Sequence, residues 1–266
     1  MGRVARALIL HELMERGRDR WVLVITALFA LLAVGITAYG GSSEQTAAVV
    51  TAPSLVTLAA FLVPLVALML GHDAIVGERE RHTLGLLLSL PVSRGEVLLA
   101  KFLGRGLALC FAIGFGLGAA ALFFDPAQRQ IVASLIPRTM LLGAAFLSIG
   151  VLISTVTKRV STAASLAVVA WFLLVFFYDL GLLALLVATD GAVSQGTVVW
   201  LVTLNPAGLY RCELMMQLVG QSSLEQLGLA VALPGAAVRA WVWMAWIGGP
   251  LLCGAAMLSS RRTVVS

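Results

Sequence analysis

The chain contains few charged residues. Of its 266 residues, 12% are charged and 60% are hydrophobic, whereas about a quarter of the residues of a soluble domain are charged. One core of this length cannot bury so much apolar surface, which excludes a soluble globular fold. The composition predicts an integral membrane protein that faces the lipid bilayer. Its net charge of +5 is then expected to reflect membrane topology, and no nucleic-acid partner is predicted.

Several sequence motifs are missing. The three cysteines are widely spaced and form no Cys-x-x-Cys pair, which argues against a disulfide framework or a zinc site. The chain has no Gly-x-x-x-x-Gly-Lys-Ser/Thr sequence and therefore no phosphate-binding loop with which to hydrolyse ATP itself. His-Glu-x-x-His and Gly-x-Ser-x-Gly are also absent, which disfavours a protease or another membrane enzyme. We predict no catalytic residue, no cofactor and no metal site.

Six segments are long and apolar enough to be membrane-spanning helices, because a helix needs about 20 residues to cross a bilayer. They cover residues 21–39, 52–71, 102–124, 134–157, 160–189 and 238–260. Pro53 is expected near the start of the second span, and only Asp179 interrupts the fifth. Residues 1–20 carry charges throughout and are not expected to be a cleavable signal peptide. The predicted fold is all-α, with residues 21–266 as a six-span membrane domain.

Lysine and arginine are unequally distributed between the two sides of this predicted domain. With six spans, both termini lie on one side, and that side holds fourteen of the 18 Lys and Arg residues. Four lie on the other side, namely Arg129, Arg138, Arg211 and Arg239. The positive-inside rule therefore predicts that both termini are cytoplasmic. The histidines His11, His72 and His82 all fall on the cytoplasmic side, which argues against a histidine-built metal path across the bilayer.

Residues 72–101 form a predicted cytoplasmic loop, and residues 77–96 of it read GERERHTLGLLLSLPVSRGE. The apolar middle of this stretch is too short to cross a membrane. Thr83 can cap a helix and Pro91 can end one, so we expect a helix of about two turns between them. Two uses of this helix are open. It could lie among lipid headgroups, or it could insert into a groove of a cytoplasmic partner.

This loop resembles the first cytoplasmic loop of ABC-type exporter permeases of the second class. The matching residues are Gly77, Glu78, Glu80, Thr83, Leu84, Leu87, Leu88, Pro91, Arg94 and Lys101. His82 stands where the family usually has glycine, and Gly85 where it often has glutamate. The resemblance covers the whole chain. It implies an amphipathic elbow helix within residues 1–20, a cytoplasmic coupling helix in the loop, and a homodimer of permeases in the bacterial inner membrane that works with a cytoplasmic ATPase dimer.

The resemblance also implies which residues contact the ATPase. They are Glu78, Glu80, Arg81, His82, Thr83, Leu84, Leu87, Leu88, Pro91 and Arg94. In such transporters, ATP closes the ATPase dimer, whose grooves pull on the coupling helix and move the spans.

A narrower resemblance links the chain to the permeases of transporters that support nitrous oxide reductase maturation. It is carried by HDAIVGE at residues 72–78, FYDLGLLALLV at 177–187 and WLVTLNPAGLYR at 200–211. It implies that the transporter moves a sulfur species or assists copper delivery for the enzyme's copper cluster, together with a periplasmic partner protein. The alternatives are an ABC permease that exports a lipid, a peptide or a drug, and a proton-coupled carrier or channel.

Asp179 is the only acid available within a span to drive a proton-coupled carrier. A carboxylate within the membrane is costly unless it faces a cavity or a partner. Asp179 lies about 20 residues into the fifth span, and two interpretations are open. It is either a structural residue near the outer headgroups or part of an outer gate or transport path.

The longest outer segment, residues 190–237, is more apolar than an exposed loop requires. This composition predicts short re-entrant or interfacial helices. Tyr210 and Arg211 are predicted to contact the periplasmic partner. Cys212, Met215 and Met216 could attract Cu(I) as soft ligands. Without a regular Met-x-x-Met array, they are expected to pack in the protein instead. Within the third span, Gly114 and Gly118 are spaced as in helix–helix contacts.

Overall fold

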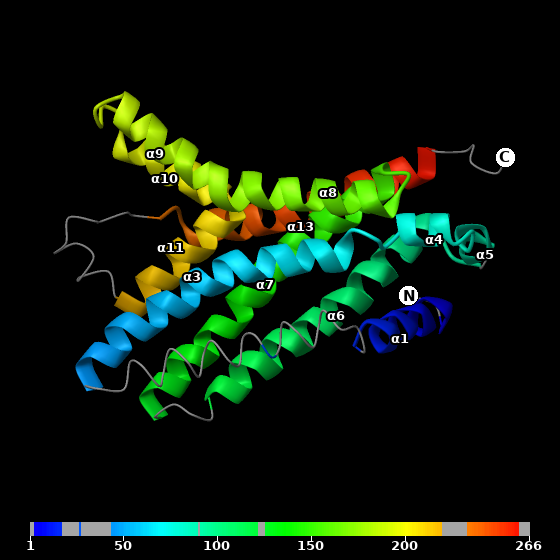
Figure 1. Cartoon of the computed structure of the whole chain (residues 1–266), viewed down its shortest axis with the longest axis horizontal. Coiled ribbons are helices and arrows are strands. Elements are labelled where there is room, and N and C mark those ends of the chain that lie inside the picture. The colour runs from blue at the N-terminus through cyan, green and yellow to red at the C-terminus, as the bar shows by residue number, and fades with distance from the viewer. Residues whose placement is uncertain are drawn as a thin grey trace.

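The computed structural model describes residues 3–17, 27, 44–89, 91–121, 126–219 and 233–260. In these ranges the chain forms helices and no strand (Figure 1), as predicted. Five of the helical segments are long and apolar enough to cross a membrane. The first predicted span, residues 21–39, lies outside the described residues apart from Ala27. The protein is therefore an all-α integral membrane protein.

Three helices form the centre of the bundle: α3 (Glu44–Gly71), α6 (Arg94–Ala121) and α7 (Pro126–Val156). Their facing side chains, such as Val56 and Phe146, are completely buried. α3 and α7 approach closely at Gly71 and Gly150, since a Cβ atom on Gly150 would lie 2.9 Å from the carbonyl oxygen of Leu68. Small residues permit such contact between membrane helices.

The glycines that the sequence analysis selected do not make the close helix contact. A Cβ atom on Gly118 would have no neighbour within 4 Å, and one on Gly114 would meet only the end of the Met140 side chain, at 3.7 Å. The spacing of Gly114 and Gly118 is common in a glycine-rich chain. Gly71 and Gly150 lie on different helices, so no spacing within one segment could have revealed them.

The remaining elements surround these three helices. The N-terminal helix α1 (Arg3–Gly17) packs on α6, and α13 (Ala236–Ser260) packs on α7. The short helices α4 (Val76–Glu80) and α5 (Leu84–Leu88) connect α3 to α6. Helices α1, α4, α5 and the end of α13 lie at the same end of the molecule (Figure 1), which we call the basal end. The opposite, distal end carries the connection between α9 and α10.

Prolines lie inside the long helices. Pro53 and Pro64 are within α3, Pro137 within α7 and Pro250 within α13. The apolar span begins at Pro53, as predicted, although α3 itself extends back to Glu44. Membrane helices tolerate such prolines where side chains and neighbouring helices satisfy the freed backbone groups. In α3, the hydroxyl of Thr57 donates to the carbonyl oxygen of Pro53 at 2.9 Å.

The fifth predicted span is built from three pieces: α8 (Val160–Trp171), the π-helix η1 (Phe172–Phe177) and α9 (Tyr178–Ala188). Figure 1 shows a bend between α8 and α9, which is the effect expected of a π-helical insertion. Only 11% of the apolar window of this span is buried, against 56% for α3 and 61% for α6 and α7. Its exposed face therefore needs lipid or another protein surface as its neighbour.

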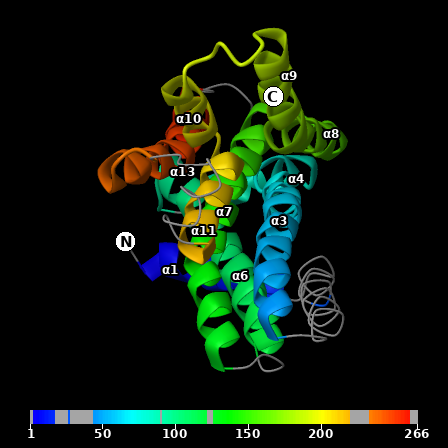
Figure 2. The same cartoon turned by 90° about the vertical axis from the view of Figure 1, so that its left-hand side faces the viewer.

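Helices α10 (Gln195–Leu204) and α11 (Pro206–Val219) form a hairpin that enters the bundle from the distal end. The turn residue Asn205 is buried, and its side-chain amide donates to the carbonyl oxygen of Leu174 at 2.7 Å. Leu174 is midway along residues 160–188, so the turn lies at mid-span. Figure 2 shows α11 between α3 and α13. Non-helical backbone at this depth is tolerated only where protein surrounds it.

Candidate functional site

Helix α4 is fixed to the junction between α7 and α8. The hydroxyl oxygen of Ser154 accepts the backbone N–H groups of Ile75, at 2.8 Å, and of Val76, at 3.0 Å. The carboxylate of Glu80 accepts the backbone N–H of Val160 at 2.7 Å, and this caps the first turn of α8. Arg79 donates to the carbonyl oxygen of Thr157. A movement of α4 is therefore transmitted directly to α7 and α8.

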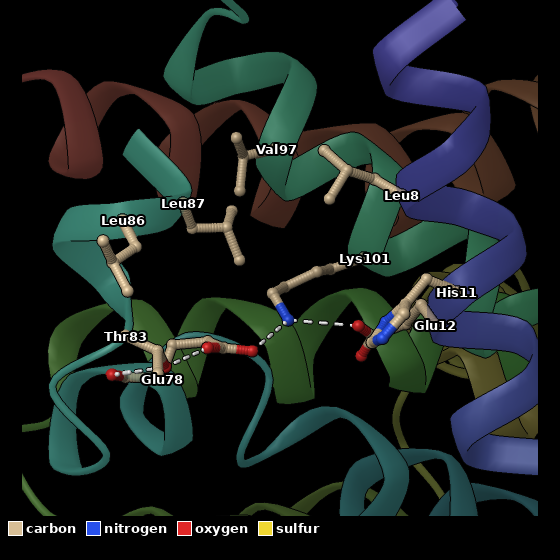
Figure 3. Close-up of a pocket in the computed structure, with 9 residues that line it drawn as sticks. All are labelled: Leu8, His11, Glu12, Glu78, Thr83, Leu86, Leu87, Val97 and Lys101. Atoms are coloured by element: carbon tan, nitrogen blue, oxygen red, sulfur yellow. Dashed lines mark hydrogen bonds and ion pairs between the residues drawn. The ribbon is translucent and has the colours of Figure 1, made fainter. Parts of the chain in front are cut away.

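A network of buried ion pairs lies beside α4, at the basal end of α6. Lys101 Nζ lies 3.1 Å from Glu12 Oε2 on α1 and 2.9 Å from Glu78 Oε1 on α4 (Figure 3). Arg105 Nε lies 2.6 Å from Glu12 Oε1, and its Nη1 pairs with Asp73. The side chains of Glu12, Lys101 and Arg105 are 6%, 7% and 1% exposed. Charges this deeply buried are stable only when paired.

Arg105 also caps the C-terminal end of α3. Its Nη1 donates to the carbonyl oxygen of Leu70 at 2.5 Å, one of the last carbonyls of α3, which have no partner within the helix. A cation at a helix C-terminus is further stabilised by the helix dipole. One guanidinium thus joins α1, α3 and the turn that follows α3.

The Glu12 carboxyl is held in its ionised form. Burial alone would raise its pKa, but the charges of Arg105 and Lys101 and their hydrogen bonds outweigh burial, so the pKa of Glu12 lies below its ordinary value. A lowered pKa means that the ionised pair stabilises the docking of α1 at neutral pH. This stabilisation is lost only as the pH falls through the lowered pKa.

The sequence analysis missed Glu12, Asp73 and Arg105. A signal was present, because Lys101 and Arg105 are one helical turn apart and are the charged residues of α6 beyond its first turn. Two such cations on one face require acidic partners. The identity of those partners was not predictable from spacing, since Glu12 is 89 residues from Lys101 along the chain.

Gly104 permits the close contact of α1 with α6. A Cβ atom on Gly104 would lie 2.7 Å from Glu12 Cβ and 3.0 Å from the carbonyl oxygen of Ile9. We expect Gly104→Ala to displace α1 and to lower the free energy of unfolding by about 1–3 kcal/mol, as overpacking does. Gly118→Ala on the same helix is the matched control, because nothing lies within 4 Å of its Cβ position. Unfolding of the purified variants in detergent measures both, and equal stability of the two would contradict this packing.

A cavity of about 400 Å³ separates α1 from α5 above the ion pairs (Figure 3). Leu8 of α1, Leu86 and Leu87 of α5 and Val97 of α6 line its apolar walls, while its polar lining includes the ion pairs of Lys101. Thr83 stands at the N-cap position of α5, but its hydroxyl donates to the Glu78 carboxylate instead of capping that helix.

The predicted ATPase-contacting residues fall into two groups. Glu78, Glu80 and Arg94 make bonds within the chain, and Arg94 Nη1 donates to the carbonyl oxygen of Leu258 at the end of α13, at 2.8 Å. Leu84 packs in a small core that includes Leu258, and Leu87 lines the cavity. The second group, Arg81, His82 and Pro91, is exposed. The side chain of Leu88 lies outside the described residues.

Among the leucines of the loop whose side chains the structure describes, the most exposed is Leu86, which was not among the predicted contacts. Leu86 is 72% exposed at the edge of the cavity between α1 and α5. In a five-residue helix, each leucine points in a different direction, so composition alone could not say which one is free. Leu86, Arg81 and His82 are therefore exposed side chains of the loop.

His82 occupies a left-handed backbone conformation, with φ of 57°. This explains why glycine suits the position, since left-handed angles cost a residue with a Cβ about 1–2 kcal/mol. We expect His82→Gly to raise the free energy of unfolding by up to about 1 kcal/mol. Ser89→Gly, in the same loop but at φ of −81°, is expected to lower it. Thermal unfolding of the two purified variants compares them, and a loss of stability in both would contradict the prediction.

Asp179 and Tyr210, predicted on the distal side, are both engaged within the chain. Asp179 Oδ2 lies 2.5 Å from Arg211 Nη2, and this ion pair joins α9 to α11, which supports the structural interpretation of Asp179. The Tyr210 side chain is completely buried, with its hydroxyl 3.0 Å from that of Thr139. This burial speaks against Tyr210 as a contact for an external partner. Arg211 is 25% exposed.

Cys212 lies beside this ion pair on α11 and is partly buried. Within the part of the chain that the structure describes, no group of three or more His, Cys, Asp or Glu side chains is arranged to hold a metal ion. Met215 packs against the main core, as expected of a core methionine.

The chain matches known proteins along nearly its whole length. The family model described as ABC-2 family transporter protein matches residues 6–256. The chain belongs to this family. It is 41% identical over 266 residues to the "Probable ABC transporter permease protein NosY" of Stutzerimonas stutzeri, covering 95% of this chain and 96% of the relative. It is 40% identical over 268 residues to the protein of the same name from Pseudomonas aeruginosa, with the same coverage.

The ABC-2 membership identifies the chain as the permease subunit of an ABC transporter, in which a partner subunit hydrolyses ATP. The loop between α3 and α6 is thus the candidate site for that partner. The ion network and the α4 contacts connect this loop to α1, α6, α7 and α8.

Proposed function

We propose that the transporter supports nitrous oxide reductase maturation by moving a sulfur species or assisting copper delivery. The observation that carries the proposal is the 41% identity to NosY, which extends over 95% of the chain. The three stretches at residues 72–78, 177–187 and 200–211 add to it. They include Asp73 of the ion network, Asp179 of the distal ion pair and Asn205 of the mid-span turn.

In the proposed mechanism, ATP closes the partner ATPase dimer, which moves α5. Leu86 anchors the contact, because a leucine that is 72% exposed gains free energy when a partner buries it. The movement reaches α6 through the Glu78–Lys101 pair, α8 through Glu80, and α13 through Arg94. The spans then alternate between two arrangements. No ATP chemistry is required of this chain.

We further propose that two copies of the chain assemble in the bilayer. The sparsely buried helices α8–α9 and α13, the latter with 17% of its apolar window buried, offer the surfaces for the second copy and for lipid. The periplasmic partner is assigned to the segment 190–237, where the turn around Ser194 is exposed. Tyr210 is left out of this contact because it is buried.

The proposed orientation places the basal end in the cytoplasm and the distal end in the periplasm. Ser194 at the distal end and Ser161 at the basal end are both exposed, which makes them a matched pair. We expect Ser194→Cys to react with a membrane-impermeant maleimide added outside intact cells, and Ser161→Cys to react only after lysis. Labelling of Ser161→Cys in intact cells would reverse the orientation.

A gene-replacement experiment tests the proposed function. In a denitrifying host that lacks its own NosY, we expect expression of this chain to restore copper-cluster assembly and activity of nitrous oxide reductase. The control is the same chain carrying Leu86→Asp, which is expected to reach the membrane without restoring activity. Full enzyme maturation in the host without any permease would contradict the proposal and leave export of a lipid, a peptide or a drug as the alternative.

A further inference from the structure

Glu12 is the carboxylate that both buried cations of α6 share. One of its oxygens faces Lys101 and the other faces Arg105. On the far side, each cation has a second acidic partner in the segment after α3, Glu78 for Lys101 and Asp73 for Arg105. A chain of alternating charges therefore runs from α1 across α6 to the loop that carries α5.

This chain of charges joins α1 to the α5 region through buried side chains. Leu8 on α1 and Leu86 and Leu87 on α5 line the walls of the 400 Å³ cavity, so their apolar side chains leave a space between the two helices. The ion pairs of Lys101 border that space. Buried charge-assisted bonds of this kind are strong and directional.

We infer that Glu12 is a positioning residue for α5. Through Lys101 and Arg105 it holds α1, the basal part of α6 and the α4–α5 loop as one unit, so that a displacement of α5 carries α1 with it. The inference rests on the proposed contact between the ATPase and α5. Without the Glu12 charge, Lys101 keeps Glu78, and Arg105 keeps Asp73 and the Leu70 carbonyl. The buried link from these cations to α1 is lost, and α1 constrains the loop less.

The test measures the distance between α1 and α5 by pulsed electron paramagnetic resonance. Spin labels are attached to Ala7→Cys and Ser89→Cys, both exposed positions, in a chain whose three native cysteines are replaced, reconstituted in nanodiscs. We expect a narrow distance distribution that ATP and the ATPase leave unchanged. With Glu12→Gln, we expect the distribution to broaden by about twofold, because a less constrained loop samples more positions, and to shift when ATP is added.

Glu15→Gln is the matched control, because Glu15 lies one turn along α1 and also pairs with the loop, through Arg81. This pair is 3.9 Å long and its side chains are 69% and 45% exposed, so it contributes little, and the distribution should equal that of the unsubstituted chain. If Glu12→Gln does not fold, Glu78→Gln interrupts the same chain of charges at a more exposed carboxylate and should broaden the distribution likewise. Lys101→Arg should keep the distance distribution narrow, and Lys101→Met should broaden it. This comparison distinguishes the effect of the positive charge from the effect of side-chain volume.

Narrow, ATP-independent distributions for both Glu12→Gln and Glu78→Gln would overturn the inference. The width measured on the permease alone does not depend on the ATPase, so it decides the inference even if the proposed docking fails. Docking is judged separately, by whether Leu86→Asp releases the ATPase.

Discussion

Replacement of Leu86 by aspartate is expected to release the ATPase from the permease. Leu86 is 72% exposed on α5. A groove of the ATPase that buries Leu86 in the unsubstituted chain would have to bury the charged aspartate in the variant. We expect the substitution to weaken the complex by at least about 2 kcal/mol, roughly 30-fold in Kd. Co-purification of a tagged permease with its ATPase, followed by ATP hydrolysis by the eluted complex, measures the effect.

Leu86→Met is the matched control, because it keeps an apolar side chain of similar volume and should retain the ATPase. Leu87→Asp is informative in a different way. Leu87 lines the cavity between α1 and α5, so its aspartate should disturb the position of α5 itself. Normal assembly and ATP turnover with Leu86→Asp would remove α5 as the docking element.

Replacement of Arg105 by methionine is expected to cause the largest loss of stability. The Arg105 side chain is 1% exposed and pairs with Glu12 and Asp73. Removing it takes the guanidinium from Glu12, Asp73 and the Leu70 carbonyl. Breaking a buried ion pair in this way costs about 3–5 kcal/mol. Unfolding of the purified variants in detergent, or the yield of folded protein in the membrane, measures this loss.

Arg138→Met supplies the control for that experiment. Arg138 is 34% exposed, and its partner Glu213 keeps a second arginine, Arg239, at 2.8 Å. We expect a loss within about 1 kcal/mol, as for other exposed ion pairs. If the two arginine variants unfold alike, the network around Arg105 is not the stabilising element that its burial indicates.

The all-α membrane fold was predictable from the sequence because hydrophobic segments of sufficient length have few alternatives in a bilayer. The short helix of the loop was also predictable, from Thr83, Pro91 and the apolar residues between them. Helix ends were less accurate. The apolar span begins at Pro53, but α3 extends back to Glu44, because membrane helices tolerate internal prolines.

The arrangement of the candidate site depended on contacts between distant segments. Glu12 reaches Lys101 across 89 positions, and Arg94 reaches Leu258 across 164. Leu86 and Leu87 are adjacent in sequence and both line the cavity, but Leu86 is exposed and Leu87 is partly buried. Tyrosine is a residue type that is common at interfaces, yet the Tyr210 side chain is enclosed by Thr139 and the core. Residue type indicated the chemistry, and only the packing determined which residues are accessible.

Site-specific photo-crosslinking tests the central claim most directly. A photoreactive amino acid at position 86 is expected to give a covalent adduct with the ATPase when cells are irradiated, while the same group at Ser194, at the distal end, should give none. Adducts with the ATPase at position 194 and none at position 86 would contradict the account of α5 as the element through which ATP drives this permease.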